Sequence, residues 1–112
     1  MKNDAIRIST TGGRETMDKN EIISILRTFK QKFAQQYGIT ALGVFGSVAR
    51  GQSREDSDVD VCIKTVTPDP FLLVHIKEGI EQSVHHRVDI VRIREKMNPF
   101  LKERIDKECI YV

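Results

Sequence analysis

The feature that most constrains this chain is a strand-like run in which carboxylates alternate with apolar side chains. Residues 58–64 read Asp-Val-Asp-Val-Cys-Ile-Lys. Successive side chains of a β-strand point to opposite faces, so Asp58 and Asp60 share one face and the valines share the other. The run therefore predicts a sheet whose valine face is covered by helices, which leaves the opposite face available for a site.

Periodic apolar residues supply the helices for such a sheet. They recur at threes and fours from Ile22 to Tyr37. Asp18 or Asn20 can cap the helix that this spacing predicts, and Gly38 can end it. Prolines open two further predicted helices, and short apolar runs predict further strands. These helices are expected over residues 70–83 and 99–107, and the strands over residues 41–45, 59–64, 87–92 and 109–112.

The length of 112 residues is that of one domain with one core. We expect residues 1–17 to form a flexible leader or, over residues 5–9, a loosely attached strand. Residues 18–112 are expected to form the folded domain. Apolar side chains make up 39% of the chain and charged ones 30%, which is an ordinary balance for a folded domain.

Composition excludes several classes of protein. A net charge of only +2 gives no general attraction to nucleic acids or membranes. No apolar run is long enough to span a membrane, and the start lacks the apolar core of a signal peptide, so a cytoplasmic location is expected. Cys62 and Cys109 are too few for a disulfide framework and lack C-x-x-C spacing, so both are predicted to be packed thiols in a reducing cytosol.

Asp58 and Asp60 form a candidate metal site. On a strand their Cα atoms would lie roughly 6.5–7 Å apart on one face, where the two carboxylates repel each other. A divalent cation relieves this repulsion, and oxygen ligands suit Mg²⁺. Asp89 interrupts another apolar strand and becomes the third member if that strand lies beside the first. Three converging carboxylates can hold a pair of ions.

The acidic stretch has two competing explanations. From Asp56 to Asp58 it can be a polar turn that enters the strand, which is the preferred explanation for Asp56. A calcium-binding loop would use Asp56, Asp58 and Asp60 at its first, third and fifth positions. It also needs glycine at position six and glutamate at position twelve, where this chain has Val61 and Thr67. The calcium loop is therefore excluded.

A glycine-serine turn ends ten residues before the acidic pair. Gly46 and Ser47 follow a predicted strand, and residues 48–50 can begin a helical turn, so backbone N–H groups converge there. Gly46 permits close approach of the backbone to a phosphate, and Ser47 can donate a hydrogen bond. Arg50 can order the loop or contact phosphate. The turn matches neither the Walker A nor the dinucleotide-binding glycine pattern. Beside the aspartates it indicates a metal–nucleotide site.

The combined pattern resembles a known superfamily. Gly46-Ser47, ten further residues and then Asp58-x-Asp60 is similar to the nucleotidyltransferase superfamily of DNA polymerase β, in which a further aspartate, here Asp89, lies on a later strand. The resemblance implies that the Gly-Ser pair holds the triphosphate of ATP and that the acidic pair binds Mg²⁺. It also implies that Asp89 completes the catalytic metal site and helps to activate the acceptor.

The fuller strings narrow the resemblance further. Gly-Ser-Val-Ala-Arg-Gly at residues 46–51 and Ser-Asp-Val-Asp-Val at residues 57–61 look most like the minimal nucleotidyltransferases. These are short single-domain proteins, often encoded beside a HEPN-domain protein in toxin–antitoxin pairs. The resemblance covers roughly residues 20–110. It implies a mixed α/β (α+β) fold with a small mixed sheet flanked by helices, and transfer of AMP from ATP to a tyrosine of the HEPN toxin.

Other functions stay open from the sequence. The chain can instead be a non-catalytic antitoxin that binds nucleotide, or only the toxin, and neutralises the toxin by occlusion; the three aspartates favour catalysis. A small-molecule nucleotidyltransferase is disfavoured, because larger family members carry an added helical domain for the acceptor. A partner or a second subunit, in a homodimer or hetero-oligomer, is therefore expected to complete the pocket. A zinc site at His75, His85 and His86 has no supporting ligand spacing.

Overall fold

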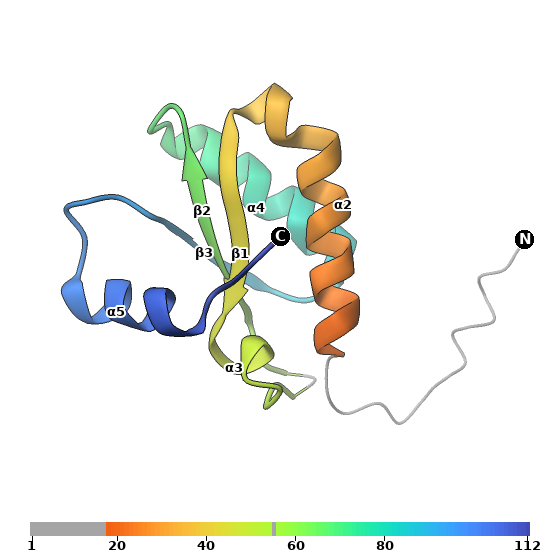
Figure 1. Cartoon of the computed structure of the whole chain (residues 1–112). Helices are drawn as coiled ribbons and strands as arrows, with labels where there is room; N and C mark the ends of the chain where they lie inside the picture. Colours follow the sequence, from red (N-terminus) through yellow and green to blue (C-terminus); the bar gives the residue numbers. More distant parts are fainter. Residues whose placement is uncertain (1–17, 55) are drawn as a thin grey trace, which may run out of the picture.

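The structure, a computed structural model, describes residues 18–54 and 56–112, so the expected leader and its strand over residues 5–9 lie outside it. Figure 1 shows a small sheet with helices packed on it. Each helix and strand predicted for the domain is confirmed, with ends shifted by at most two residues. In chain order the elements are α2 (Lys19–Tyr37), β1 (Ile39–Phe45), α3 (Gly46–Ala49), β2 (Val59–Thr65), α4 (Pro70–Val84), β3 (Val88–Arg92), α5 (Pro99–Glu108) and β4 (Ile110–Tyr111).

Helix ends follow the capping residues in the sequence. Asp18 is the residue that caps α2, since its carboxylate accepts a hydrogen bond from the backbone N–H of Asn20 at 2.9 Å. Asp69 and Asn98 cap α4 and α5 in the same way, each just before a proline. These local signals place the helices before any tertiary contact is considered.

The four strands form one mixed sheet in the order β3-β2-β1-β4. β1 pairs antiparallel with β2 on one side and with β4 on the other. β2 and β3 pair in parallel, and α4 connects them, because parallel neighbours cannot be joined by a tight turn. The mixed α/β class predicted from the sequence is confirmed.

One face of the sheet carries the main core. Val59, Val61 and Ile63 of β2 are fully buried there, against apolar residues of α2 and α4 such as Leu26 and Ile80. The alternation predicted for this strand is therefore confirmed. Burial of this kind, at about 25 cal/mol per Å² of apolar surface, provides the main driving force of folding.

The opposite face is not left open, which corrects the prediction of one-sided cover. α5 lies on it and buries Ile105 against Phe45 and Cys62 in a second, smaller cluster. Leu101 and Ile105 are one helical turn apart, so α5 has an apolar stripe that must find a partner. The prediction put all the helices on one side of the sheet, because the apolar stripe of α5 alone does not show which face it covers.

The two cysteines also differ from prediction. Cys62 is buried as expected, but a disulfide joins it to Cys109, just beyond α5, where two separate thiols were predicted. The chain can approach closely here because Gly43 of β1 lies below: a Cβ at Gly43 would be 2.8 Å from the carbonyl oxygen of Ile110. The pairing follows from the packing of α5, and a separation of 47 residues gives no sign of it.

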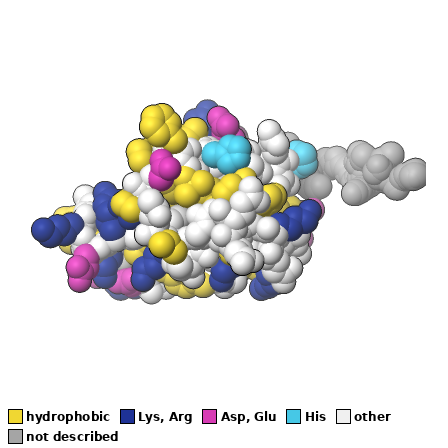
Figure 2. Space-filling model, turned by 90° about the horizontal axis from the view of Figure 1, so that it is seen from above, with side chains coloured by type: hydrophobic (Ala, Val, Ile, Leu, Met, Phe, Trp, Pro, Cys, Tyr) yellow, Lys and Arg dark blue, Asp and Glu magenta, His cyan; other side chains and the backbone are white. Residues whose placement is uncertain are grey.

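Not every apolar residue of α4 faces the sheet. Figure 2 looks down on the end of the molecule where β2 stops, and hydrophobic side chains lie at the surface there between polar and charged ones. Val66, Phe71 and Val74, from the loop after β2 and the start of α4, are among the exposed apolar residues. Within residues 18–54 and 56–112, no helix is long and apolar enough to cross a membrane.

Candidate active site

The strand aspartates Asp60 and Asp89 lie opposite each other on neighbouring strands. β2 and β3 are parallel and in register, with Asp60 paired to Asp89. The residues on either side of each aspartate contribute to the helix-covered core, so both carboxylates belong to the other face, where α5 packs. The condition that the sequence left open, that the strand of Asp89 lies beside that of Asp60, is therefore met.

The electrostatics of Asp60 show that the other two predicted carboxylates act on it. Partial burial raises the pKa of the Asp60 carboxyl above its usual value. The negative charges of Asp89 and Asp58 raise this pKa further, whereas Arg104 and Arg50 oppose the change. The site thus holds a carboxylate whose ionised form is disfavoured until a cation compensates it.

Asp58 lies just before β2 rather than within it. Its side chain is 47% exposed, and its Oδ1 lies 3.7 Å from Nε of Arg87. The carbonyl oxygen of Arg87 accepts a hydrogen bond from the N–H of Val59 at 2.8 Å, which holds the segment before β3 beside the start of β2. Asp58 is therefore an exposed carboxylate that lies two residues before Asp60, outside the strand.

Gly46 brings the glycine-serine turn directly against Asp60. Its φ of +75° lies in the left-handed region, which favours glycine. A Cβ at Gly46 would lie 3.1 Å from Cγ of Asp60 and would collide with its Oδ2. Both the backbone conformation and the space therefore require glycine, and the turn and the metal-site candidate form one place in the molecule.

The loop between the turn and Asp58 is folded back on itself. The carbonyl oxygen of Ser47 accepts the N–H of Gln52 at 2.8 Å, and the hydroxyl of Ser57 accepts the N–H of Arg54 at 2.9 Å. Asp56 is exposed in a turn, as predicted. In the described part of the chain the Ser47 hydroxyl makes no hydrogen bond, so it can donate to a ligand.

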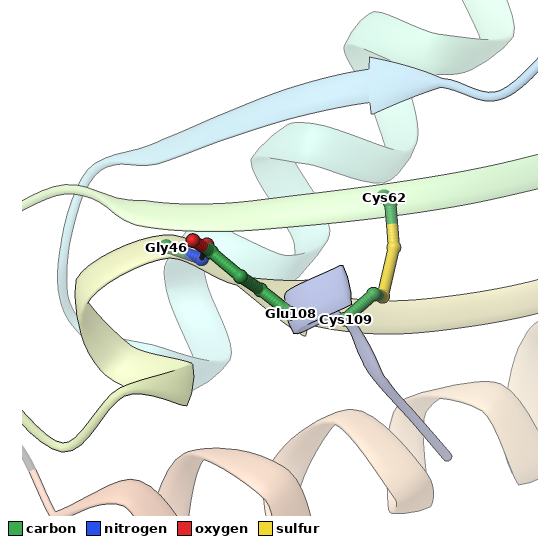
Figure 3. Close-up of a disulfide and its surroundings, with 4 residues drawn as sticks. All are labelled: Gly46, Cys62, Glu108 and Cys109. Carbon is green, nitrogen blue, oxygen red and sulfur yellow. Dashed lines mark hydrogen bonds between the residues drawn. A yellow bond between two sulfur atoms is a disulfide. The ribbon is translucent and has the colours of Figure 1, made fainter. Parts of the chain in front are cut away.

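Arg50 is engaged by α5, in a contact that the sequence reasoning missed. Its Nη1 lies 3.0 and 3.1 Å from the two carboxylate oxygens of Glu108, and its Nε donates to Gln52 at 3.1 Å. The N–H of Gly46 donates to Glu108 Oε1 at 3.1 Å (Figure 3). Of the two roles expected for Arg50, these contacts favour ordering of the loop. Glu108 is 62 residues from Gly46, so no local pattern could have identified it.

Arg104 is a second residue of α5 that reaches this region. Its guanidinium carbon lies 5.6 Å from the ring centroid of Phe45, which directly precedes Gly46. Its charge acts on Asp60 in the direction that favours the ionised carboxylate. A helix that the sequence reasoning treated as cover thus adds charge to the site.

The oxygen donors fit a divalent cation. Asp60 and Asp89 form a carboxylate pair; burial and then the charge of Asp89 raise the pKa of Asp60, and a bound Mg²⁺ would offset both effects. Among the described residues, no group of three or more His, Cys, Asp or Glu side chains is arranged to hold a metal ion. The chain would therefore supply part of the ligands, and phosphate oxygens and water the rest. His75 contacts Tyr37 through a 3.1 Å hydrogen bond, away from this site.

Comparison with known proteins indicates independently which family this chain resembles. The sequence profile of the family described as "Nucleotidyltransferase domain" matches residues 26–112. The protein adenylyltransferase MntA of Thermococcus cleftensis is 32% identical over 93 residues, which cover 82% of this chain and 93% of that protein. The same enzyme class, nucleotidyltransferase, was implied by the family resemblance that the glycine-serine turn and the aspartates carry.

Solved structures agree with the fold. A minimal nucleotidyltransferase is 32% identical and superposes with a TM-score of 0.71, covering 84% of this chain and 95% of that one. An MNT antitoxin complex with a tri-AMPylated HEPN toxin from Shewanella oneidensis superposes with a TM-score of 0.53 at 18% identity, covering 83% of this chain and 66% of that one. At that identity the second likeness concerns the fold alone. The predicted polymerase-β-like nucleotidyltransferase fold is confirmed.

Proposed function

Since this chain belongs to the nucleotidyltransferase domain family, we propose that it transfers AMP from ATP to a hydroxyl group of a partner protein, a tyrosine of a HEPN-domain toxin. The observation that carries the proposal is the placement of Gly46 against Asp60, with Asp89 in register beside it. A phosphate-binding turn and a pair of acidic metal ligands are the two parts that a metal–nucleotide complex requires.

Asp58, Asp60 and Asp89 are the proposed metal ligands and catalytic residues, with Asp60 and Asp89 already in register and Asp58 joining them when the ions and the nucleotide bind. Two bound Mg²⁺ ions would neutralise charge on the phosphate oxygens and lower the pKa of the attacking hydroxyl. Asp60 lies directly against Gly46, so it would hold a cation close to the phosphates that the turn binds. Asp89 is exposed, so it can reach an acceptor that arrives from solvent.

The reaction is an in-line displacement at the α-phosphorus. The acceptor oxygen forms a bond to this phosphorus as the bond to the bridging oxygen of the β-phosphate breaks, and pyrophosphate leaves. The hydroxyl proton passes to the Asp89 carboxylate and then to water. The Ser47 hydroxyl, which is free to donate, binds a phosphate oxygen and keeps the chain of phosphates aligned.

The partner is proposed from the comparisons. The relatives include protein adenylyltransferases, and solved structures of similar fold include an antitoxin bound to an AMPylated HEPN toxin. We take residues 18–112 as the domain that binds this toxin, in a hetero-oligomer that completes the pocket.

We place the reaction in the cytoplasm, where ATP is available. Disulfides persist mainly in oxidising compartments. In a reducing cytosol, Cys62 and Cys109 are therefore expected as neighbouring thiols, and the bonded form belongs to oxidising conditions.

A label-transfer assay tests the proposed function. Purified protein is incubated with Mg²⁺ and α-labelled ATP, with and without the toxin encoded by the neighbouring gene, beside an Asp58→Ala/Asp60→Ala control. Label on a toxin tyrosine that vanishes in the control, or when EDTA removes the metal, is the expected result. A tight complex with the toxin but no label from any of the four nucleotides would show a binding antitoxin instead.

A further inference from the structure

The contact between the end of α5 and the glycine-serine turn has a role beyond packing. We infer that Glu108 is a positioning residue for nucleotide binding, which acts by fixing Gly46 and Arg50 so that Ser47 faces the phosphates. The inference rests on the proposed function, because the geometry of the turn matters to a ligand only if the turn holds the triphosphate.

The first step is the backbone N–H of Gly46. Gly46 is buried, and a buried N–H without an acceptor is strongly unfavourable. Phe45, at the N-cap position, makes no side-chain capping bond, so Glu108 Oε1 at 3.1 Å is the acceptor that satisfies this group. The left-handed conformation of Gly46, on which its approach to Asp60 depends, is thereby held by a charge-assisted hydrogen bond.

The second step is Arg50. Both carboxylate oxygens of Glu108 accept from Arg50 Nη1, so one carboxylate ties together the first residue of α3 and the residue that ends it. Ser47 lies between these two tied positions. Because Glu108 already uses the N–H of Gly46, contact with phosphate falls to Ser47 and the backbone after it, while Gly46 supplies the space beside Asp60.

The third step is that the position of Glu108 is itself fixed by the surrounding structure. It is the last residue of α5, its side chain is only 24% exposed, and the N–H of Cys109 bonds to the carbonyl oxygen of Ile105 at 2.9 Å. Ile105 is buried, and directly after Cys109 the chain forms β4, where Ile110 pairs with Val44 of β1. Glu108 therefore approaches the turn from a backbone that is anchored to the sheet on both sides.

The test measures binding of the Mg²⁺ complex of α,β-methylene-ATP, which cannot transfer AMP, by calorimetry below the Tm of every variant. Glu108→Ala is expected to weaken binding about tenfold, because the turn loses its charge-assisted bonds. Glu108→Gln keeps an acceptor for the N–H of Gly46, so its affinity for the analogue should lie between those of the wild type and Glu108→Ala. Glu103→Gln, on the same helix and exposed, is the matched control and should bind as the wild type does.

A double-mutant cycle adds a readout that a merely structural role would not move. Arg50→Ala with Glu108→Ala should bind no more weakly than Glu108→Ala alone, since both residues act through one contact. A residue that only stabilises the fold would lower the Tm and the binding stoichiometry but leave the Kd of the folded fraction unchanged.

Three results would overturn the inference. An unchanged Kd for Glu108→Ala would make Glu108 a structural residue, and tighter binding would make it a competitor of phosphate; both leave the proposed function standing. If the wild type itself does not bind the analogue, the proposed function fails together with the inference. Should Glu108→Ala not fold, the comparison of Glu108→Gln with the wild type decides.

Discussion

On the α2–α4 side of the sheet β2 contributes Val59, Val61 and Ile63, all fully buried, whereas on the α5 side the same strand contributes Asp60 and Cys62. The first face removes apolar surface from water and favours folding. The second places a partly buried carboxylate beside two others, which disfavours folding until a cation or proton arrives. The two faces of one strand thus make opposite contributions to folding stability. Substitutions on the helix-covered face should mainly change stability, and substitutions on the α5 side should mainly change activity.

The largest expected effect is on the α5 side. Asp60→Asn should lower the rate of AMP transfer on the order of a thousandfold, because a charged ligand of the proposed site is lost. The Tm measured without metal should stay the same or rise, since the substitution removes a repelled carboxylate. Single-turnover transfer and thermal unfolding are the two measurements.

Asp56→Asn is the matched control for that substitution. Asp56 is exposed in the turn ahead of the strand, so the transfer rate and the Tm of the Asp56→Asn variant should equal those of the wild type. A fully active Asp60→Asn variant would remove Asp60 from the site and with it the distinction between the faces.

The next effect lies on the helix side of the same strand. Ile63→Ala should lower the free energy of unfolding by about 2–5 kcal/mol, because it leaves a cavity in the core. The Kd for nucleotide, measured on the folded protein, should hardly change. Lys64→Ala, at the exposed neighbouring position, is the control in denaturant titrations, and equal losses for both would contradict the assignment of faces.

The disulfide should stabilise the α5 side when it is formed. Its cysteines are 47 residues apart, and closing a loop of this size is worth about 2–4 kcal/mol, mainly through the unfolded chain. Reduction should therefore lower the midpoint of urea unfolding of the oxidised wild type and leave Cys109→Ser unaffected. A midpoint that does not depend on the reductant would show that the bond adds no stability.

The smallest effect concerns pH: the contributions of the Glu81 and Asp60 carboxyls to stability change in opposite directions as the pH rises. Val88 N–H, and then Lys77, lower the pKa of Glu81, so its contribution to stability is present above its unfolded pKa and is lost as pH falls through the folded pKa. The raised pKa of Asp60 works the other way, and stability is lost as pH rises through its folded pKa.

Unfolding between pH 3 and pH 7 in EDTA should reveal this contrast. Relative to the wild type, Glu81→Gln should lose stability only at the upper end of the range, and Asp60→Asn should gain it there. Parallel curves for both variants would mean that the two faces do not differ electrostatically.

Local signals in the sequence were sufficient for most of the fold and for the centre of the site. Asp18 and Gly38 mark the two ends of α2, and the alternation from residue 58 sets which side chains of β2 face the helices. The glycine-serine turn lies where the strand before it ends. Asp60 and Asp89 were recognised as site candidates because both interrupt apolar strands, whereas the pairing of their strands was only a condition, which the structure meets.

Contacts between distant segments could not be predicted in this way. Glu108 and Arg104 reach the site only because α5 turns back across the sheet, and no periodicity states which face a helix will cover. The disulfide was missed for the same reason. Asp58 was placed within the strand, but β2 begins at Val59, because strand pairing with β3 starts there.

The in-register pairing of Asp60 with Asp89 also determines which length changes this domain can absorb. The connections on either side of α4 are loops, so an extra residue there lengthens a linker and leaves the strand pairing as it is. One extra residue inside β3 ahead of Asp89 would turn its carboxylate to the helix side and bring an apolar neighbour to the site. Related chains can therefore vary in loop length around α4. The lengths of β2 and β3 ahead of the two aspartates cannot change without moving one carboxylate away from the other.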